Sequence, residues 1–427
     1  MNSGAIYTPN VPGDGKFDQD KFPDEIDLQV GRIDMNKMTG FSNTETGLIQ
    51  QYLQKNHDFR LKNIQPLNRA IMNTSMDIQL ANTSASAWRS FSAMFGNNIL
   101  NLNNCSFGCT EFIDSLNTES YLWAHMAGGG SDTSMQNDVF TSSHCINNPI
   151  NSIFMQMYGS YLVEWYKGGI STQQNLLLRA PLASSGTTLA TVWSGRAPSW
   201  HFHHMALGET IGYSEKVNQN NYTTYESGMP TLRKGIHMNL MGDPTLKMHI
   251  VSPISNITSS QNGSSVDISW IGSADNNIVG YNIYRADSVY GKFTKLNSSY
   301  VITTNFNDAN PLPTNNVYMG RAVKLENEAS GSYYNLSTGL MDSIQIGPLG
   351  VEKKLAEIDF SIFPNPALDK INFSRNLNGI EIMNSLGEII MTQSGKIKSI
   401  SVNNFPNGIY FLKSENEIKK FAIYKGN

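Results

Sequence analysis

The sequence predicts a multidomain chain with an N-terminal α/β domain over residues 1–251, a β-sandwich over 252–346, a linker over 347–358 and a small all-β domain over 359–427. Three observations predict this order. In the first part, apolar runs that end in loop residues alternate with segments of helical periodicity. The second part holds short alternating strands rich in aromatic residues, and the last part holds period-two apolar pairs separated by turn residues.

The first half of the α/β domain shows strands followed by helices. Residues 25–33 alternate as a strand, and Ser42-Asn43-Thr44-Glu45 has the capping-box pattern that opens a helix to about His57. A second strand is expected over 69–80 and a second helix over 85–95. This alternation is typical of an α/β unit.

Two further apolar runs place the expected crevice. Residues 120–125 and 152–157 predict strands, and glycine loops at 128–130 and Gly159 follow them. Ligands bind beyond the carboxyl ends of parallel strands, so we expect the functional crevice at these loops.

The middle part is predicted as a β-sandwich with aromatic residues in its core. Val266, Ile268 and Trp270 alternate along one strand, and Tyr281 and Tyr284 lie on the next. Together with a later strand that carries Tyr318, these segments resemble a fibronectin type III domain. We expect these aromatics to pack inside the sandwich and to carry no chemistry.

The last part is predicted as a small antiparallel domain. Its apolar pairs are Ile371 and Phe373, Ile380 and Ile382, Ile400 and Val402, Tyr410 and Leu412, and Phe421 and Ile423, with Ile389 as a further candidate. Such pairs, separated by turn residues, are typical of half-buried strands.

Four placed features of this tail resemble the C-terminal sorting domain of proteins exported by the type IX secretion system of Bacteroidota. They are the opening at 363–366, the Asn384-Ser385-Leu386-Gly387 turn, the turn and strand at 406–410, and a lysine pair. The resemblance implies a chain that binds the type IX secretion machinery and is secreted or held on the outer cell surface. The implied sorting-signal residues are Pro364, Asn365, Pro366, Gly408, Tyr410, Lys419 and Lys420.

Composition excludes two classes of partner. A net charge of −4 and a pI near 6.1 give no basic excess for nucleic acid. No apolar run approaches the roughly 20 residues that span a bilayer.

The first residues lack the basic and apolar regions of a signal peptide, which exported cargo needs. We therefore expect the chain to be a fragment with an incomplete first domain.

Two short segments of the first domain resemble landmarks of gingipain-like cysteine peptidases, whose fold is a caspase-like α/β domain. They are Val30-Gly31-Arg32-Ile33 and the segment at 240–246. Those enzymes frequently carry a β-sandwich and then the same sorting tail, so the order of parts is similar. The resemblance implies a protein or peptide as substrate or ligand, and no cofactor.

That resemblance implies a His at the end of one strand and a Cys at the end of the next, because an imidazole must take the proton of the thiol. His125 stands at the first position, although Met-Ala-Gly follows it. The second position, before Gly159, holds Gln156-Met157-Tyr158 and no cysteine. Cys145, in a loop upstream, is the candidate nucleophile. The alternative is a degenerate domain without catalysis.

The other two cysteines leave their pairing open. Cys105 and Cys109 either pair with each other, or one of them pairs with Cys145. Either choice leaves one thiol over. A zinc site is not expected from them, since the second half of a zinc-ligand pattern is missing.

A histidine cluster offers a different chemistry. In a strand, His201 and His203 would share a face and could hold a metal with Glu209 as a third ligand. The alternative is that these imidazoles pack beside neighbouring aromatic residues.

The loop Gly128-Gly129-Gly130 suggests either an anion cradle or a plain tight turn. Asp132, which follows it, either orients His125 or is a solvated loop residue.

Three functions follow from these residues. The first is an active cysteine endopeptidase that uses His125 and Cys145. The second is a pseudo-enzyme or a surface binding and adhesion protein, and the third is a metal-dependent hydrolase. The missing cysteine before Gly159 favours the second over the first.

Overall fold

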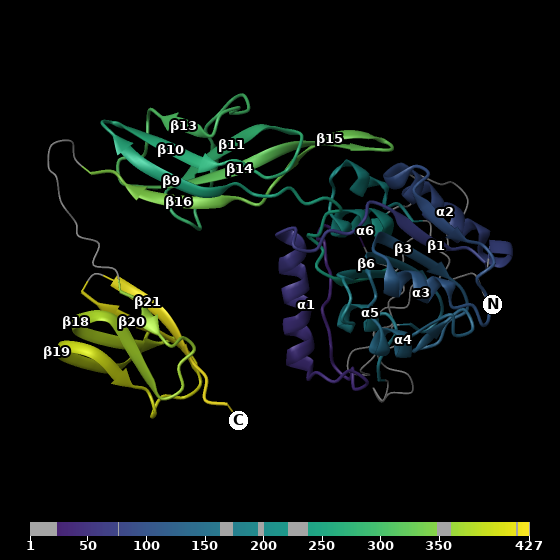
Figure 1. The fold of residues 1–427 in the computed structure, drawn as a ribbon, viewed down its shortest axis with the longest axis horizontal. Coiled ribbons are helices and arrows are strands. Elements are labelled where there is room, and N and C mark those ends of the chain that lie inside the picture. Colours follow the sequence, from purple (N-terminus) through teal and green to yellow (C-terminus); the bar gives the residue numbers. More distant parts are fainter. Residues whose placement is uncertain are drawn as a thin grey trace. The chain divides into compact units, whose positions relative to one another are not determined.

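The structure, a computed structural model, describes residues 24–75, 77–162, 174–194, 200–220, 238–347, 360–415 and 417–426, without the side chains of 77–83. The predicted linker and residues 1–23 fall almost wholly outside this part. By their internal contacts the residues form two compact units, Met1–Leu349 and Gly350–Asn427. The expected order of an α/β region, a β-sandwich and an all-β tail is confirmed (Figure 1). The exact domain boundaries stay predictions.

A six-stranded sheet forms the centre of the α/β region. Its order is β2-β1-β3-β6-β7-β8, parallel from β2 to β7 and antiparallel at β8. The strands are β1 (Ala70–Asn73), β2 (Ile99–Leu102), β3 (Tyr121–Ala127), β6 (Ser152–Tyr158), β7 (Ala190–Ser194) and β8 (Met238–Gly242). The chain places β2 on one side of β1 and then crosses to the other side of β1 to form β3, so the strand order reverses between β1 and β3. This switch places the crevice beyond the carboxyl ends of β1 and β3.

Helices and a small hairpin complete this region. They are α1 (Glu45–Arg60), α2 (Asp77–Phe95), α3 (Glu111–Thr118), β4 (Ser134–Met135), β5 (Phe140–Thr141), α4 (Ser142–Asn147), α5 (Ala180–Ala183), η2 (His203–Leu207) and α6 (Ile211–Asn220). Every residue of β3 is buried. Since successive side chains point to opposite faces, both faces of the sheet are covered at this strand.

Three local predictions in this region are wrong. Residues 25–33 form no strand beyond a single bridge from Arg32 to Met241, and Leu28 is 72% exposed, so the alternation does not face a core. The strand predicted over 69–80 ends at Asn73, where a turn stabilised by the Asn73 side chain leads into α2. Helix α1 is capped by Thr44, whose hydroxyl accepts from Gly47, not by Ser42.

The sandwich consists of two antiparallel sheets. One has the order β13-β10-β9, and the other has β12-β11-β14-β15 with β16 on β14. The strands are β9 (Ser255–Asn262), β10 (Ser265–Ile271), β11 (Ile278–Ala286), β12 (Thr294–Lys295), β13 (Asn305–Asp308), β14 (Asn315–Glu328), β15 (Gly331–Leu336) and β16 (Leu340–Gln345). Trp270, Tyr281 and Tyr318 lie in its core as expected, whereas Tyr284 is only half-buried.

The tail forms its own sheet and core. Its order is β17-β18-β20-β21, and β19 pairs with β18. The strands are β17 (Ile362–Phe363), β18 (Lys370–Asn384), β19 (Ile389–Ser401), β20 (Gly408–Ser414) and β21 (Glu417–Ile423). All five predicted apolar pairs are buried, but Ile389 is 58% exposed, which corrects its assignment to the core. Among the helices in the described ranges, none has the length and apolar character to cross a membrane.

Candidate functional site

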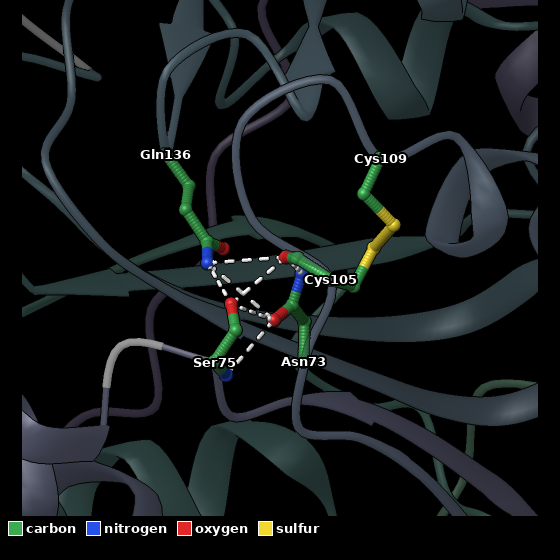
Figure 2. The surroundings of a disulfide bond; sticks show 5 residues. All are labelled: Asn73, Ser75, Cys105, Cys109 and Gln136. Carbon is green, nitrogen blue, oxygen red and sulfur yellow. Dashed lines mark hydrogen bonds between the residues drawn. A yellow bond between two sulfur atoms is a disulfide. The ribbon is translucent and has the colours of Figure 1, made fainter.

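Polar side chains, of which Asn73 and Gln136 are buried, form a network at the carboxyl edge of the α/β sheet, where the crevice is expected. Figure 2 shows Asn73, at the end of β1, and Ser75 directed at the carbonyl oxygen of Cys105. Asn73 Nδ2 and Ser75 Oγ donate to this oxygen at 2.9 and 2.8 Å. Gln136 Nε2 donates to the same oxygen at 3.3 Å and also to Ser75 Oγ. The network ties the loops after β1, β2 and β3 together.

Gln136 reaches this network from an unusual backbone. Gln136, Asn137 and Asp138 all have left-handed φ angles of 52°, 52° and 67°. Asn and Asp tolerate this region, whereas Gln adopts it at a cost. The Gln136 side chain is 1% exposed and lies against Gly128, where an added Cβ would come within 2.9 Å of it. The loop therefore holds the Gln136 side chain in the buried network.

A disulfide closes the loop that follows β2 and carries the Cys105 carbonyl. Cys105 and Cys109 are bonded to each other, which settles the pairing that the sequence left open (Figure 2). Cys145 is left as the free cysteine. The sequence patterns missed Asn73, Ser75 and Gln136, and the one available signal was the pair of turn-tolerant residues Asn137 and Asp138 that follows Gln136.

His125 lies inside the core and not in the crevice. It is in β3, paired with Met72 on one side and Gln156 on the other, and it is 0% exposed. Its ring meets Phe91 edge to face at 6.4 Å. Burial lowers the pKa of His125 from 6.5 to about 3, so the imidazole is neutral. Neither ring nitrogen has a hydrogen-bond partner within the described residues.

Cys145 is placed equally deep. It lies in α4 with 1% exposure, and burial raises the pKa of its thiol well above the ordinary value. His144, its neighbour in sequence, caps the same helix through a capping box with Thr141. Because the ring nitrogens of His125 have no partner, no hydrogen bond joins His125 to Cys145 among the described contacts.

The histidine cluster is not on a strand. His203 begins η2, so it does not share a strand face with His201 as the metal reading required. His201 Nδ1 lies 3.1 Å from Arg89, and the rings of His203 and His204 stack at 4.2 Å. Burial first, and then Arg89, lowers the pKa of His201 to about 3. The described residues contain no group of three His, Cys, Asp or Glu suited to a metal ion.

Gly128-Gly129-Gly130 bend after β3 and end in a bridge between Gly130 and Met135. An added Cβ at Gly130 would lie 2.5 Å from the backbone oxygen of Ser160, so the two backbones pack directly together. Asp132 accepts a hydrogen bond through its backbone carbonyl from Leu177 at 2.8 Å. Since His125 has no ring partner among the described groups, Asp132 does not orient it.

A hollow of about 150 Å³ lies elsewhere in the first unit. It is lined by residues of the α1–β1 connection, such as Lys62 and Gln65, and by Lys324 and Glu326 of the sandwich. None of the residues predicted to carry chemistry lines it. It is therefore separate from the crevice.

The Pro-Asn-Pro opening of the tail covers one edge of its sheet. Asn365 Oδ1 accepts from Ala422 at 2.8 Å, and Asn365 Nδ2 donates to the Lys420 carbonyl at 3.5 Å. Ala367 continues this contact with two backbone hydrogen bonds to 422 and 424, of 2.8 and 2.9 Å. Pro364 and Pro366, which lack an N–H, flank Asn365 on the solvent side. The segment satisfies donors and acceptors that β21 would otherwise expose.

The remaining predicted signal residues divide between core and surface. Tyr410 packs against Phe405 and Phe421 and donates its hydroxyl to the Pro406 carbonyl at 2.8 Å. Lys419 places its ammonium 6.0 Å from the ring centre of Phe360, a cation–π arrangement. Gly408 begins β20 and is exposed, as is Lys420. Their roles in sorting stay predictions.

Comparisons with known proteins assign the tail. Residues 361–424 match the family described as "Secretion system C-terminal sorting domain". None of the curated proteins compared with the chain matches it.

Among solved structures, the Arg-specific cysteine proteinase gingipain R is 13% identical with a TM-score of 0.42, and the match covers 70% of this chain and 72% of that one. A structure described as a protease is 11% identical over the same shares, with a TM-score of 0.39. An Fn3-like protein from Clostridium thermocellum is 14% identical, with a TM-score of 0.17 over 22% of this chain and 92% of its own. TM-scores this low carry no argument about activity. The family match, in contrast, identifies the role of the tail. Residues 361–424 are a secretion system C-terminal sorting domain, which directs the chain through type IX secretion to the cell surface or the medium.

Proposed function

We propose that the chain is an exported protein whose α/β domain binds a protein or peptide at its crevice and does not hydrolyse it through a cysteine. The observation that carries the proposal is the state of the cysteines. The chain has three, two are joined in a disulfide, and the third, Cys145, is buried with its thiol pKa raised. A cysteine peptidase needs an accessible thiolate beside an imidazole, and no other thiol exists to supply it.

The crevice itself supports binding over thiol chemistry. Its described polar groups are the amides of Asn73 and Gln136, the hydroxyl of Ser75 and the Cys105 carbonyl. These neutral donors and acceptors are of the kind that pairs with a peptide backbone, and a bound peptide would replace some of the hydrogen bonds that they make with one another. A disulfide beside the crevice also suits an oxidising extracellular setting.

Activity measurements separate this proposal from an active endopeptidase. The full chain, Cys145→Ala and His125→Ala are incubated with a mixture of unfolded proteins and peptides, with Ser143→Ala as the control beside Cys145. We expect no hydrolysis above background in any of them, and no labelling of native Cys145 by a thiol reagent. Hydrolysis that disappears in both Cys145→Ala and His125→Ala, but not in Ser143→Ala, would restore the endopeptidase function.

Binding is tested with a variant that blocks the crevice. A Cβ added at Gly129 meets no atom within 4 Å, and the position is exposed, so Gly129→Trp places a bulky side chain on the loop after β3, beside the expected crevice. Fluorescence anisotropy with labelled peptides from unfolded proteins should show binding to the full chain that Gly129→Trp weakens. Leu53→Trp, at a 54% exposed position of α1, is the control. Equal binding by Gly129→Trp and the unmodified chain contradicts the proposal.

A further inference from the structure

The outward face of the sorting-domain sheet is apolar at its centre. An antiparallel sheet with one face on a core normally carries polar side chains on the other. In this sheet, Met383 of β18 pairs with Phe411 of β20 on one side and with Ile389 of β19 on the other. Phe411 pairs in turn with Lys420 of β21. Paired side chains on one face are neighbours, so Met383, Phe411 and Lys420 form one strip across three strands, and Ile389 of β19 joins it at a register shift between Ile382 and Met383.

Ile409 extends this strip along β20. It lies two residues before Phe411 and pairs with Ala422, so it points to the same outward face. Ile409 is 47% exposed and Ile389 is 58% exposed. Met383 and Phe411 are half-buried. An exposed apolar area of this kind on a folded domain marks a surface that a partner covers.

Folding of the domain does not explain these side chains. In β20, Tyr410 and Leu412 are 5% and 0% exposed and belong to the core. Ile409 and Phe411 alternate with them on the opposite face and contribute nothing to that core. The strand therefore needs Tyr410 and Leu412 to fold, and its two other apolar residues remain to be explained.

Charge at the margin of the strip indicates what the partner presents. Lys420 ends the strip and is exposed, and Lys413 lies one row away. Lys413 is 3.7 Å from Glu381, which balances part of its charge. A partner that offers an apolar patch with carboxylates at its rim would be complementary to this surface.

We propose that Ile389, Met383, Ile409, Phe411 and Lys420 form the surface by which the sorting domain binds a component of the type IX secretion machinery. The occupant follows from the family of residues 361–424, since a sorting domain must be recognised by the system that exports it. The opposite face packs on the core, and the edge at β21 is covered by Asn365 and Ala367. The proposal rests on the sorting domain alone and not on the function of the α/β domain.

Export of the full chain, expressed behind a signal peptide in cells that contain the secretion system, tests the surface. Ile409→Asp and Phe411→Asp each place a charge in the strip and should lower the exported fraction about tenfold or more, with the protein retained in the envelope. The matched control is Leu368→Asp, which alters a 60% exposed apolar residue of the same domain outside the strip. It should be exported like the unmodified chain.

Folding and sorting are separated by two additional measurements. Thermal unfolding and hydrogen exchange of each purified full-length variant verify that the sorting domain is folded. Lys420→Glu changes charge at an exposed position without adding or removing apolar volume, and it should lower export several-fold with the fold unchanged. Normal export of folded Ile409→Asp, Phe411→Asp and Lys420→Glu contradicts the proposed surface. If deletion of the tail still abolishes export in that case, the sorting assignment stands and only the surface is wrong.

Photo-crosslinking identifies the partner. Replacing Ile409 with p-benzoylphenylalanine should give an adduct with a component of the secretion machinery during export. The same replacement at Leu368 should give none. An adduct at Ile409 with a second copy of this chain, in place of a secretion component, would overturn the assignment of the partner.

Discussion

The α/β domain and the sorting domain differ in whether the residues of their motifs are exposed to solvent. In the α/β domain, His125 and Cys145 are both sealed in the core, at 0% and 1% exposure. In the sorting domain, one strand presents Tyr410 to the core and Ile409 to solvent. A reactive or recognised side chain acts only where a partner can reach it. The sorting domain therefore exposes a side chain that a partner can contact, whereas the α/β domain exposes neither the candidate imidazole nor the candidate thiol.

The cause lies in how the two sheets are covered. β3 belongs to a largely parallel sheet buried on both faces, so neither face of the strand leaves His125 in contact with solvent. β20 belongs to an antiparallel sheet with one face on its core, so alternate residues remain available. The same alternation of side chains therefore leads to burial in one domain and to display in the other.

Removal of the sorting domain gives the largest expected effect. A chain that lacks residues 360–427 should remain within the cell envelope, because the export signal lies in 361–424. The first unit has its own core, so the truncated protein should stay folded. Immunoblotting of envelope and medium fractions measures the outcome. Export of the truncated chain at the normal level would break the comparison, since the tail would then have no recognition role.

A core substitution in the sorting domain should come next. Phe421→Ala removes a 0% exposed ring that stacks on Tyr410, and it should lower the free energy of unfolding of this domain by about 3–5 kcal/mol. Hydrogen exchange of the β20 amides measures that free energy separately from the rest of the chain. A loss below about 1 kcal/mol would show that the inward residues do not hold the domain together.

The buried histidine of the α/β domain should produce an acid-dependent loss of stability. The pKa of His125 is about 3 when folded and near 6.5 when unfolded, so unfolding takes up a proton between these values. The free energy of unfolding therefore falls as the pH drops from 6.5 toward 3. For this residue the loss is about 2 kcal/mol between pH 7 and pH 5.

His125→Leu keeps a similar volume and removes the titrating group. Urea unfolding at several pH values should show a shallower acid dependence for this variant than for the unmodified chain. His201, whose pKa is also lowered to about 3, titrates in both proteins and cancels in the difference. Identical pH profiles would mean that His125 is accessible to protons in the folded state, which would weaken the contrast between the domains.

The smallest effect is expected for the outward residue of β20. Ile409→Ala should change the free energy of unfolding of the sorting domain by no more than about 0.5 kcal/mol, because the side chain packs on no core residue. The measurement is the hydrogen exchange used for Phe421→Ala. A destabilisation comparable with that of Phe421→Ala would assign Ile409 to the fold and remove the reason to seek a partner for it.

Local patterns predicted the strands and failed for the site. The alternation of Tyr410 and Leu412, and the apolar run of β6, are properties of neighbouring residues and could be recognised directly. The alternation of apolar residues over 25–33 led to a wrong strand prediction, because alternation does not show whether the apolar side faces a core or solvent. The crevice network joins Asn73 to Gln136 across 63 positions, and no local pattern records such a contact.

The position of His125 and the cysteine pairing show a second limit. All seven residues of β3 are buried, so the sequence offers no polar face from which the accessibility of His125 could be inferred. Cys105 and Cys109 lie four residues apart, a spacing that permits pairing but does not require it. Both questions depend on how distant segments fold over one another.

Asn365 and Ala367 leave the tail sheet unable to grow on one of its sides. A sheet with two unpaired outer strands adds further copies at both sides and extends into a fibre. In the described part of this domain, the outer side of β21 is already hydrogen-bonded at residues 420–424 by Asn365 and Ala367. A further strand cannot take these positions unless that segment is displaced. The segment therefore protects this end of β21 against the edge-to-edge pairing that leads to aggregation.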